Sequence, residues 1–266
     1  MRSTCFCREG IFELDVFKVI PNFVQNISYV QISLFKEYRQ LIAYLIKWFL
    51  ISTVVGGLAG LASAGFLRSL SWAGEWRSDH LWIIWLLPLG GFVVGLIYHF
   101  FGQSVEAGNN LILERIQKPD KVIPFKMAPL VLFGTVASHF FGASVGREGT
   151  AVQMGGSIAD QFSNFMKFDA ESRRTLLIIG VAAGFSSVFG TPLAGAVFGL
   201  EVFFIGKISY RAILPSLIGA VVANYVGEFA LHFMGGTHTH YHIDVIPSIN
   251  LLRILYAVLA GIAFGL

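Results

Sequence analysis

A glycine-spaced turn that carries an arginine and a glutamate lies between two apolar segments of this chain. The turn reads Gly-Ala-Ser-Val-Gly-Arg-Glu-Gly-Thr from position 142 to position 150, and its charges are Arg147 and Glu148. Residues 130–141 before it are nearly uncharged, and residues 151–158 after it are typical of the start of a helix. Each charge at bilayer depth costs about 2.5–3.5 kcal/mol on insertion scales, so an ionisable pair there indicates a functional site.

The glycines of this turn allow the backbone to leave the helical conformation and to point free N–H groups into a cavity. A helix that begins near Glu148 places the positive end of its dipole, about +0.5 charge, at the same point. Free amides and a helix dipole together favour a bound anion. We therefore interpret Gly146, Arg147, Gly149 and Thr150 as candidate anion-binding residues. The alternative is a polar loop in which both charges are solvated.

The composition indicates a membrane protein. Charged residues make up 13% of the chain and hydrophobic residues 55%, and the mean hydropathy is +0.68. Soluble domains carry about 25% charged residues. The 29 glycines suit helices that pack closely in lipid. The net charge of +3 is small and does not favour nucleic-acid binding. We expect an all-α, multi-pass protein of the cell membrane, of the bacterial inner-membrane type.

Apolar segments alternate with polar or glycine-containing breaks along the chain. A bilayer span takes about 20 apolar residues, and such spans are predicted at 41–67, 81–101 and 212–229, with another beginning at 251–266. Shorter segments, typical of broken helices, lie at 130–141, 176–189 and 193–205. Polar connectors are predicted at 68–80, 102–126, 167–174 and 231–250. Small-residue packing stripes are predicted at Gly56, Gly57, Gly60 and Ala62, and as G-x-x-x-G pairs at Gly180/Gly184, Gly195/Gly199 and Gly261/Gly265.

Inside the second connector, Gly108 is followed by Asn109 and Asn110. This pattern is typical of a helix N-cap with exposed amides, and it predicts a short helix over residues 111–117. We interpret the three residues as further candidates for anion binding. The alternative is an ordinary capped helix at the protein surface.

Three histidines alternate in the last connector, as His238, His240 and His242. Alternation would place them on one face of a strand, and imidazoles suit zinc, copper or nickel. A strand spaces these side chains too far apart to close around one ion without bending. We expect neither a metal site nor a cofactor.

Three motifs in register resemble the CLC family of chloride channels and chloride/proton antiporters. They are Gly146-Arg-Glu-Gly149, the Gly-Val-Ala-Ala-Gly-Phe run that begins at Gly180, and the Thr-Pro-Leu-Ala-Gly run that ends at Gly195. The resemblance implies a homodimer with one anion pore per subunit, each subunit being built from two inverted repeats. It implies that Glu148 is the gating glutamate, which occupies an anion position when charged and swings away when protonated.

The resemblance also implies a domain organisation. Residues 36–266 correspond to the first inverted repeat and the start of the second, and residues 1–35 are expected to be an N-terminal arm of uncertain order. The chain stops inside an apolar run, so we expect it to be truncated to about the first half of such a protein.

The sequence departs from the family pattern at three places. Asn109 and Asn110 stand where a serine usually binds the anion, and Thr150 stands where proline is usual. Both changes are similar to the fluoride-exporting branch of the family. The acidic residue that transfers protons in chloride antiporters aligns with Val202. Glu201, one position earlier, is a candidate for that role, but it faces about 100° away and a packing or capping role is the alternative.

The resulting expectation is an anion (chloride) channel or anion/proton antiporter in the lipid bilayer. A fluoride/proton antiporter of the same family is the alternative, with chloride or fluoride and protons as the transported species. A non-conducting truncated fragment or membrane scaffold is the alternative of another class, and we expect no anion flux from these 266 residues alone. An enzyme is not expected, because the sequence contains no H-E-x-x-H motif.

Overall fold

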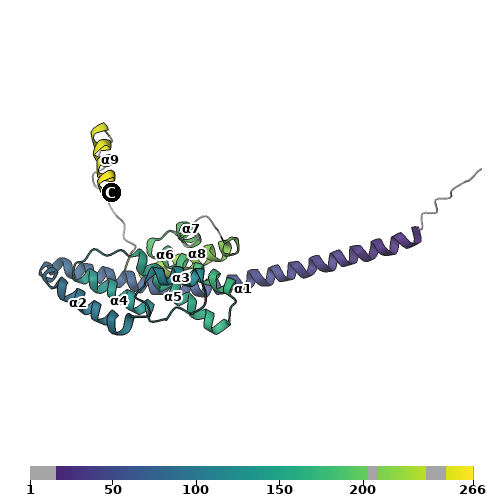
Figure 1. The fold of residues 1–266 in the computed structure, drawn as a ribbon, viewed down its shortest axis with the longest axis horizontal. Helices are drawn as coiled ribbons and strands as arrows, with labels where there is room; N and C mark the ends of the chain where they lie inside the picture. The colour runs from purple at the N-terminus through teal and green to yellow at the C-terminus, as the bar shows by residue number, and fades with distance from the viewer. Residues whose placement is uncertain (1–15, 203–208, 238–249, 266) are drawn as a thin grey trace, which may run out of the picture.

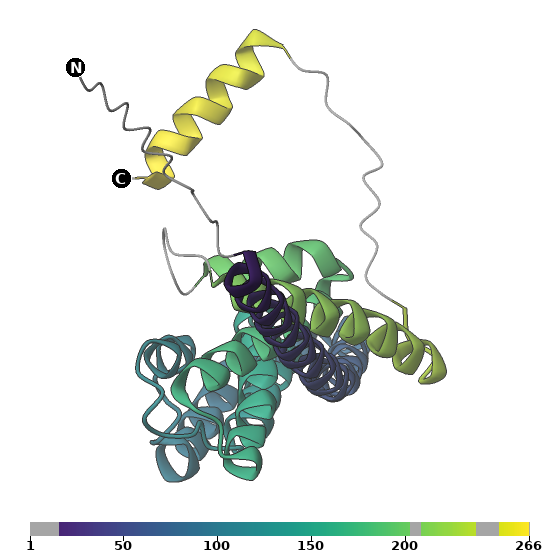
Figure 2. The same ribbon diagram turned by 90° about the vertical axis from the view of Figure 1, so that its right-hand side faces the viewer.

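The computed structural model describes residues 16–202, 209–237 and 250–265, with side chains from residue 37 onward. Every regular element within these ranges is helical, which confirms the all-α prediction. The central element is α6 (Ala170–Phe189), whose residues are mostly buried. It packs against α1 (Val16–Asp79), α5 (Glu148–Met166), α7 (Pro192–Glu201) and α8 (Ile213–Phe233), and Figures 1 and 2 show these helices gathered in one bundle.

The long helix α1 runs without a break through the predicted span 41–67 and through the predicted connector 68–80 as far as Asp79. The expectation of a loop there is wrong. Trp72 and Trp76 lie on the helix, and their rings stack on Phe140, with centroids 5.7 and 4.6 Å apart. These ring contacts give the last turns of α1 a packing partner outside the helix, although Trp72 stays 52% exposed. At its other end α1 extends beyond the bundle (Figure 1) and crosses position 36 without a break; the domain boundary there stays a prediction.

Three helical segments of the described residues are long and apolar enough to cross a bilayer: Glu37–Asp79, Leu81–Gly102 and Tyr210–Phe233. The second consists of η1 (Leu81–Leu86), α2 (Leu87–Ile97) and η2 (Tyr98–Gly102). The third consists of η3 (Tyr210–Ala212) and α8. These segments agree with the predicted spans at 41–67, 81–101 and 212–229. The shorter apolar helices are α4 (Met127–Phe140), α7 and α9 (Leu251–Gly265).

A break between α6 and α7 confirms the predicted broken helix. Gly190 ends α6 in the left-handed conformation, with φ 70°, and Pro192 is the first residue of α7. Proline fits this position because the first helical N–H has no partner within the helix. The expected connector at 167–174 is shorter than predicted, since α6 already begins at Ala170. Arg173 lies in the first turns of α6, where its guanidinium pairs with the buried carboxylate of Asp160, Nε–Oδ1 2.8 Å.

Glycines bring two helix pairs into backbone contact. A Cβ at Gly155 would lie 2.1 Å from the carbonyl oxygen of Gly180, and one at Gly184 would lie 2.2 Å from that of Ala151, so α5 and α6 touch along these positions. A Cβ at Gly60 on α1 would lie 2.5 Å from the carbonyl oxygen of Ala223 on α8. These contacts confirm the predicted packing at 180/184 and along α1. By contrast, a Cβ at Gly57, Gly261 or Gly265 would meet open space within the described structure.

The C-terminal helix α9 follows residues that the structure does not describe, and its own side chains are exposed. The predicted histidine row, His238, His240 and His242, lies outside the described residues. His232, which the sequence placed at the start of that connector, lies in the last turn of α8.

Candidate functional site

The predicted helix start at Glu148 is observed. Glu148 is the first residue of α5, Arg147 is its N-cap, and the carboxylate side chain is exposed. The first backbone N–H groups of an α-helix have no partner within the helix, and the first intrahelical bond here runs from the Ala151 N–H to the Arg147 carbonyl, 3.0 Å. Glu148 therefore sits at the positive end of α5, beside the amides of Gly149 and Thr150.

A second helix start carries the asparagines. The short helix α3 (Asn109–Gln117) begins two residues before the predicted range, and its N-cap is Gly108 with φ 57°. The backbone N–H groups of Asn110 and Leu111 donate to the carbonyls of Ala107 and Gly108, at 3.0 and 3.1 Å. Because these amides are already paired, the donors left at this helix start include the exposed side-chain amides of Asn109 and Asn110.

The two helix starts lie next to each other. The Gln153 Nε2 atom on α5 donates to the Oδ1 atom of Asn109, 3.1 Å. A Cβ built on Gly149 would lie 3.4 Å from Nδ2 of Asn109, and one on Gly108 would lie 3.2 Å from Nε2 of Gln153. With its oxygen held by Gln153, Asn109 keeps its two N–H donors beside the first turn of α5. The result is a cluster of N–H donors at the helix start that carries Glu148.

Thr150 has a different environment from its neighbours in the candidate set. Its side chain is 3% exposed, and its hydroxyl lies 2.6 Å from that of Thr135 on α4. The hydroxyl thus links the start of α5 to α4, while the backbone N–H stays in the first turn. The predicted role of Thr150 in anion binding therefore rests on its backbone amide.

We expect Thr135→Val to lower the free energy of unfolding by about 1–3 kcal/mol, because it leaves the buried Thr150 hydroxyl without a partner. The double variant Thr135→Val/Thr150→Val removes both hydroxyls and should recover most of that loss. Unfolding in detergent, followed by far-UV circular dichroism, measures both. If the double variant has a lower free energy of unfolding than Thr135→Val, the losses add, and the two hydroxyls are not coupled.

The remaining candidates fall into two groups. Gly146 and Arg147 lie in the turn directly before α5, Gly146 exposed and Arg147 half-buried. Glu201 is the exposed last residue of α7, a helix that packs against α6 and α8. Glu201 is thus on a helix away from the paired starts of α3 and α5, and its role in proton transfer stays a prediction.

Sequence reasoning missed Gln153 as a site residue. It lies four residues after Gly149 on α5, so both residues share one face of the helix. This spacing could have identified Gln153 as a polar side chain on the face of α5 that carries Gly149. Its partner Asn109 lies 44 positions earlier in the chain, and no local pattern connects the two.

Comparison with known proteins gives consistent matches in sequence. The family model with the description "Voltage gated chloride channel" matches residues 18–118 and 90–266. The chloride/fluoride channel protein of Pseudomonas syringae pv. tomato is 52% identical over 238 residues, which cover 89% of this chain and 52% of that protein. The H(+)/Cl(-) exchange transporter ClcA of Cronobacter sakazakii is 29% identical over 234 residues, which cover 81% of this chain and 49% of that protein.

Two solved structures are similar in fold. A CLC-type fluoride/proton antiporter matches with a TM-score of 0.69 at 34% identity, over 83% of this chain and 55% of that one. A slow cyanobacterial Cl−/H+ antiporter matches with a TM-score of 0.60 at 25% identity, over 82% of this chain and 54% of that one. The chain spans about half the length of the curated relatives it matches.

Proposed function

The chain belongs to the voltage-gated chloride channel (CLC) family and is a multi-pass membrane protein, and on this premise we propose that it carries an anion-transport site. The site is the cluster of N–H donors at the starts of α3 and α5, and Glu148 is its gate. The observation that carries the proposal is the contact between the two helix starts, made by the Gln153–Asn109 hydrogen bond beside Gly149. The proposed activity is that of an anion channel or an anion/proton antiporter.

Competition between a carboxylate and an anion explains how Glu148 gates. Both are negative and both are stabilised by the same free amides and helix dipole. At a separation of about 4 Å and an effective dielectric constant of about 20, the two charges repel by about 4 kcal/mol. Protonation of Glu148 removes this repulsion, so the binding of a proton favours the binding of an anion. The movement of protons and the movement of anions are coupled in this way.

Chloride is the family's default anion, and fluoride is the second candidate. The side-chain amide of Asn109, held beside Gly149, favours fluoride because this small, strongly hydrated ion needs more N–H donors to replace its water. The similarity to a CLC-type fluoride/proton antiporter structure at 34% identity supports the same candidate. A homodimer remains part of the proposal, as does a proton-transfer role for Glu201.

Equilibrium anion binding tests the proposal directly on this chain, which spans about half the length of its relatives. Isothermal titration of the detergent-purified protein with sodium fluoride and sodium chloride at low pH should detect binding of at least one anion. Stronger binding of fluoride would support the fluoride candidate, and binding of chloride alone would remove it. Failure of both anions to bind at low pH would contradict the proposed site.

Gln153→Glu should reverse the orientation of the Asn109 amide. A carboxylate at position 153 can only accept hydrogen bonds, so Asn109 must turn its Nδ2 toward it and present its oxygen to the anion. We expect anion affinity to fall at least about 10- to 100-fold, because the site loses one or two hydrogen bonds to a charged group and the new carboxylate also repels the anion. Titration calorimetry with fluoride and chloride measures the change.

Gln117→Glu is the matched control, since it adds the same charge at the exposed far end of α3. Its affinity should stay within about twofold of the unsubstituted protein. An equal loss in both variants would mean that long-range repulsion, and not the orientation of Asn109, weakens binding.

A further inference from the structure

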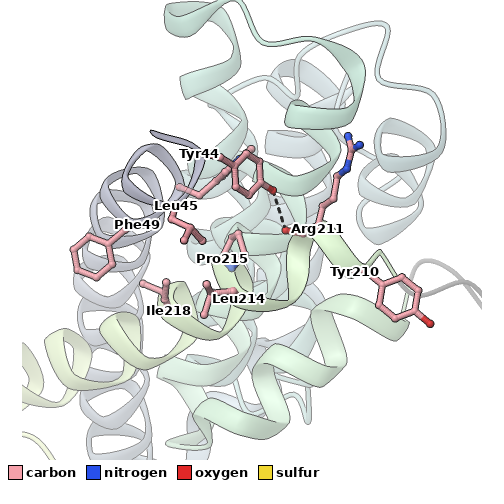
Figure 3. A pocket seen from close by; sticks show the side chains of 9 residues that line it. Tyr44, Leu45, Phe49, Tyr210, Arg211, Leu214, Pro215 and Ile218 are labelled. Carbon is pink, nitrogen blue, oxygen red and sulfur yellow. Dashed lines mark hydrogen bonds between the residues drawn. The ribbon is translucent and has the colours of Figure 1, made fainter. Parts of the chain in front are cut away.

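A groove of about 580 Å³ lies between α1 and the start of α8, away from the starts of α3 and α5. Its walls are mostly apolar: Leu45 and Phe49 come from α1, and Leu214 and Ile218 come from α8. Figure 3 shows Leu45, Leu214 and Ile218 close together between the two helices, with the ring of Phe49 turned away from them. The groove is a hydrophobic channel along the surface of the bundle.

One end of the groove is polar. The Tyr44 hydroxyl donates to the backbone carbonyl of Arg211, 3.2 Å, and the Arg211 guanidinium extends beyond this hydrogen bond, at the end opposite Ile218 (Figure 3). Arg211 is exposed and makes no ion pair with any of the described residues. The same end carries Tyr210, which is 82% exposed, as is typical of aromatic residues at a membrane–water interface.

Positive charge gathers around this end. Arg39 and Lys47 lie on α1 on either side of Tyr44, and both are exposed. Lys47 places its Nζ 4.8 Å from the ring centroid of Phe168. The single described carboxylate on this part of α1 is Glu37. Basic residues mark the cytoplasmic end of membrane spans, and the cytoplasmic leaflet holds the anionic lipids.

We propose that this groove binds one anionic phospholipid, with its phosphate beside Arg211 and Tyr44 and an acyl chain along Leu45, Leu214 and Ile218. A molecule with one anionic end and a long apolar remainder matches both the charge and the shape of the site. A second copy of this chain fits less well. A twofold axis along the bilayer normal would bring the cationic ends of both copies to the same membrane surface, where they repel each other.

Lipid retention in detergent tests the proposal on the purified chain. Native mass spectrometry with dioleoyl phosphatidylglycerol and dioleoyl phosphatidylcholine as probes should detect one phosphatidylglycerol bound in preference to phosphatidylcholine. Arg211→Gln should weaken phosphatidylglycerol binding about fivefold, the effect of one basic residue near a lipid headgroup, and leave phosphatidylcholine unchanged. This variant keeps the Tyr44 hydrogen bond, which involves only the backbone of Arg211.

Arg39→Gln is the matched control, because it removes an equal charge from the same end of α1 outside the groove lining. An equal loss in Arg39→Gln and Arg211→Gln would overturn the proposal in favour of general surface attraction. Ile218→Trp fills the apolar end and should abolish retention of both lipids, with far-UV circular dichroism confirming unchanged helix content. The proposal would also be overturned if Ile218→Trp retained as much phosphatidylglycerol as the unsubstituted protein. A dimer detected in place of the lipid adduct would overturn it as well.

Discussion

Gly184→Val is expected to separate α5 from α6 and to lower the free energy of unfolding by more than about 4 kcal/mol. The first carbon of the new side chain would lie 2.2 Å from the carbonyl oxygen of Ala151. Carbon–oxygen contacts need about 3.3 Å, so the helices must move apart by about 1 Å. Both are regular helices in a close-packed core, which cannot absorb that shift locally.

Gly57→Val on α1 is the control for this substitution. It makes the same change inside a helix, but the new side chain meets open space within the described structure. Thermal unfolding in detergent, followed by circular dichroism at 222 nm, compares the two variants with the unsubstituted protein. Equal midpoints for the two variants would show that α5 and α6 are not held at backbone contact in the folded protein.

Glu148→Gln is expected to make anion binding independent of pH. In the unsubstituted protein, binding should weaken as the pH rises and the carboxyl loses its proton, because the carboxylate then competes for the same amides. Gln stays neutral at every pH. At pH 7.5 the variant should bind anions up to about 10³-fold more tightly, which corresponds to removing about 4 kcal/mol of repulsion. Titration calorimetry with sodium fluoride and sodium chloride between pH 4.5 and 8.5 measures both effects.

Glu228→Gln removes a carboxylate of the same kind from the exposed face of α8, a helix that does not line the starts of α3 and α5. Its pH profile should follow that of the unsubstituted protein. If anion affinity still depends on pH in Glu148→Gln, the titrating group is another residue, and Glu148 is not the gate.

Local features of the sequence predicted several elements well. The start of α5 at Glu148 follows a turn with glycines on both sides of the charged pair, and the break at Gly190 and Pro192 follows from the dihedral limits of those residues. The three spans followed from apolar length alone. Each of these predictions depends on residues within one helix or one turn.

The wrong predictions, by contrast, concern segments whose structure depends on contacts with another helix. The helix α1 continues to Asp79 because Trp72 and Trp76 find Phe140 on α4, far along the chain. Charged residues expected in a connector belong to α6, where Arg173 meets a buried Asp160. In each case the partner lies on another helix, so the local polarity of the segment pointed to a loop.

The sequence by itself determined where helices begin, where they break and which of them are apolar enough to enter a bilayer, because those properties follow from local dihedral preferences and from the transfer of side chains out of water. The tertiary structure alone decided which helix starts face each other. The Gln153–Asn109 bond joins residues 44 positions apart. It forms because α3 packs against both α5 and α6, so closely that a Cβ on Gly156 of α5 would lie 3.2 Å from Cδ1 of Ile112 on α3, and packing of that kind depends on the whole bundle.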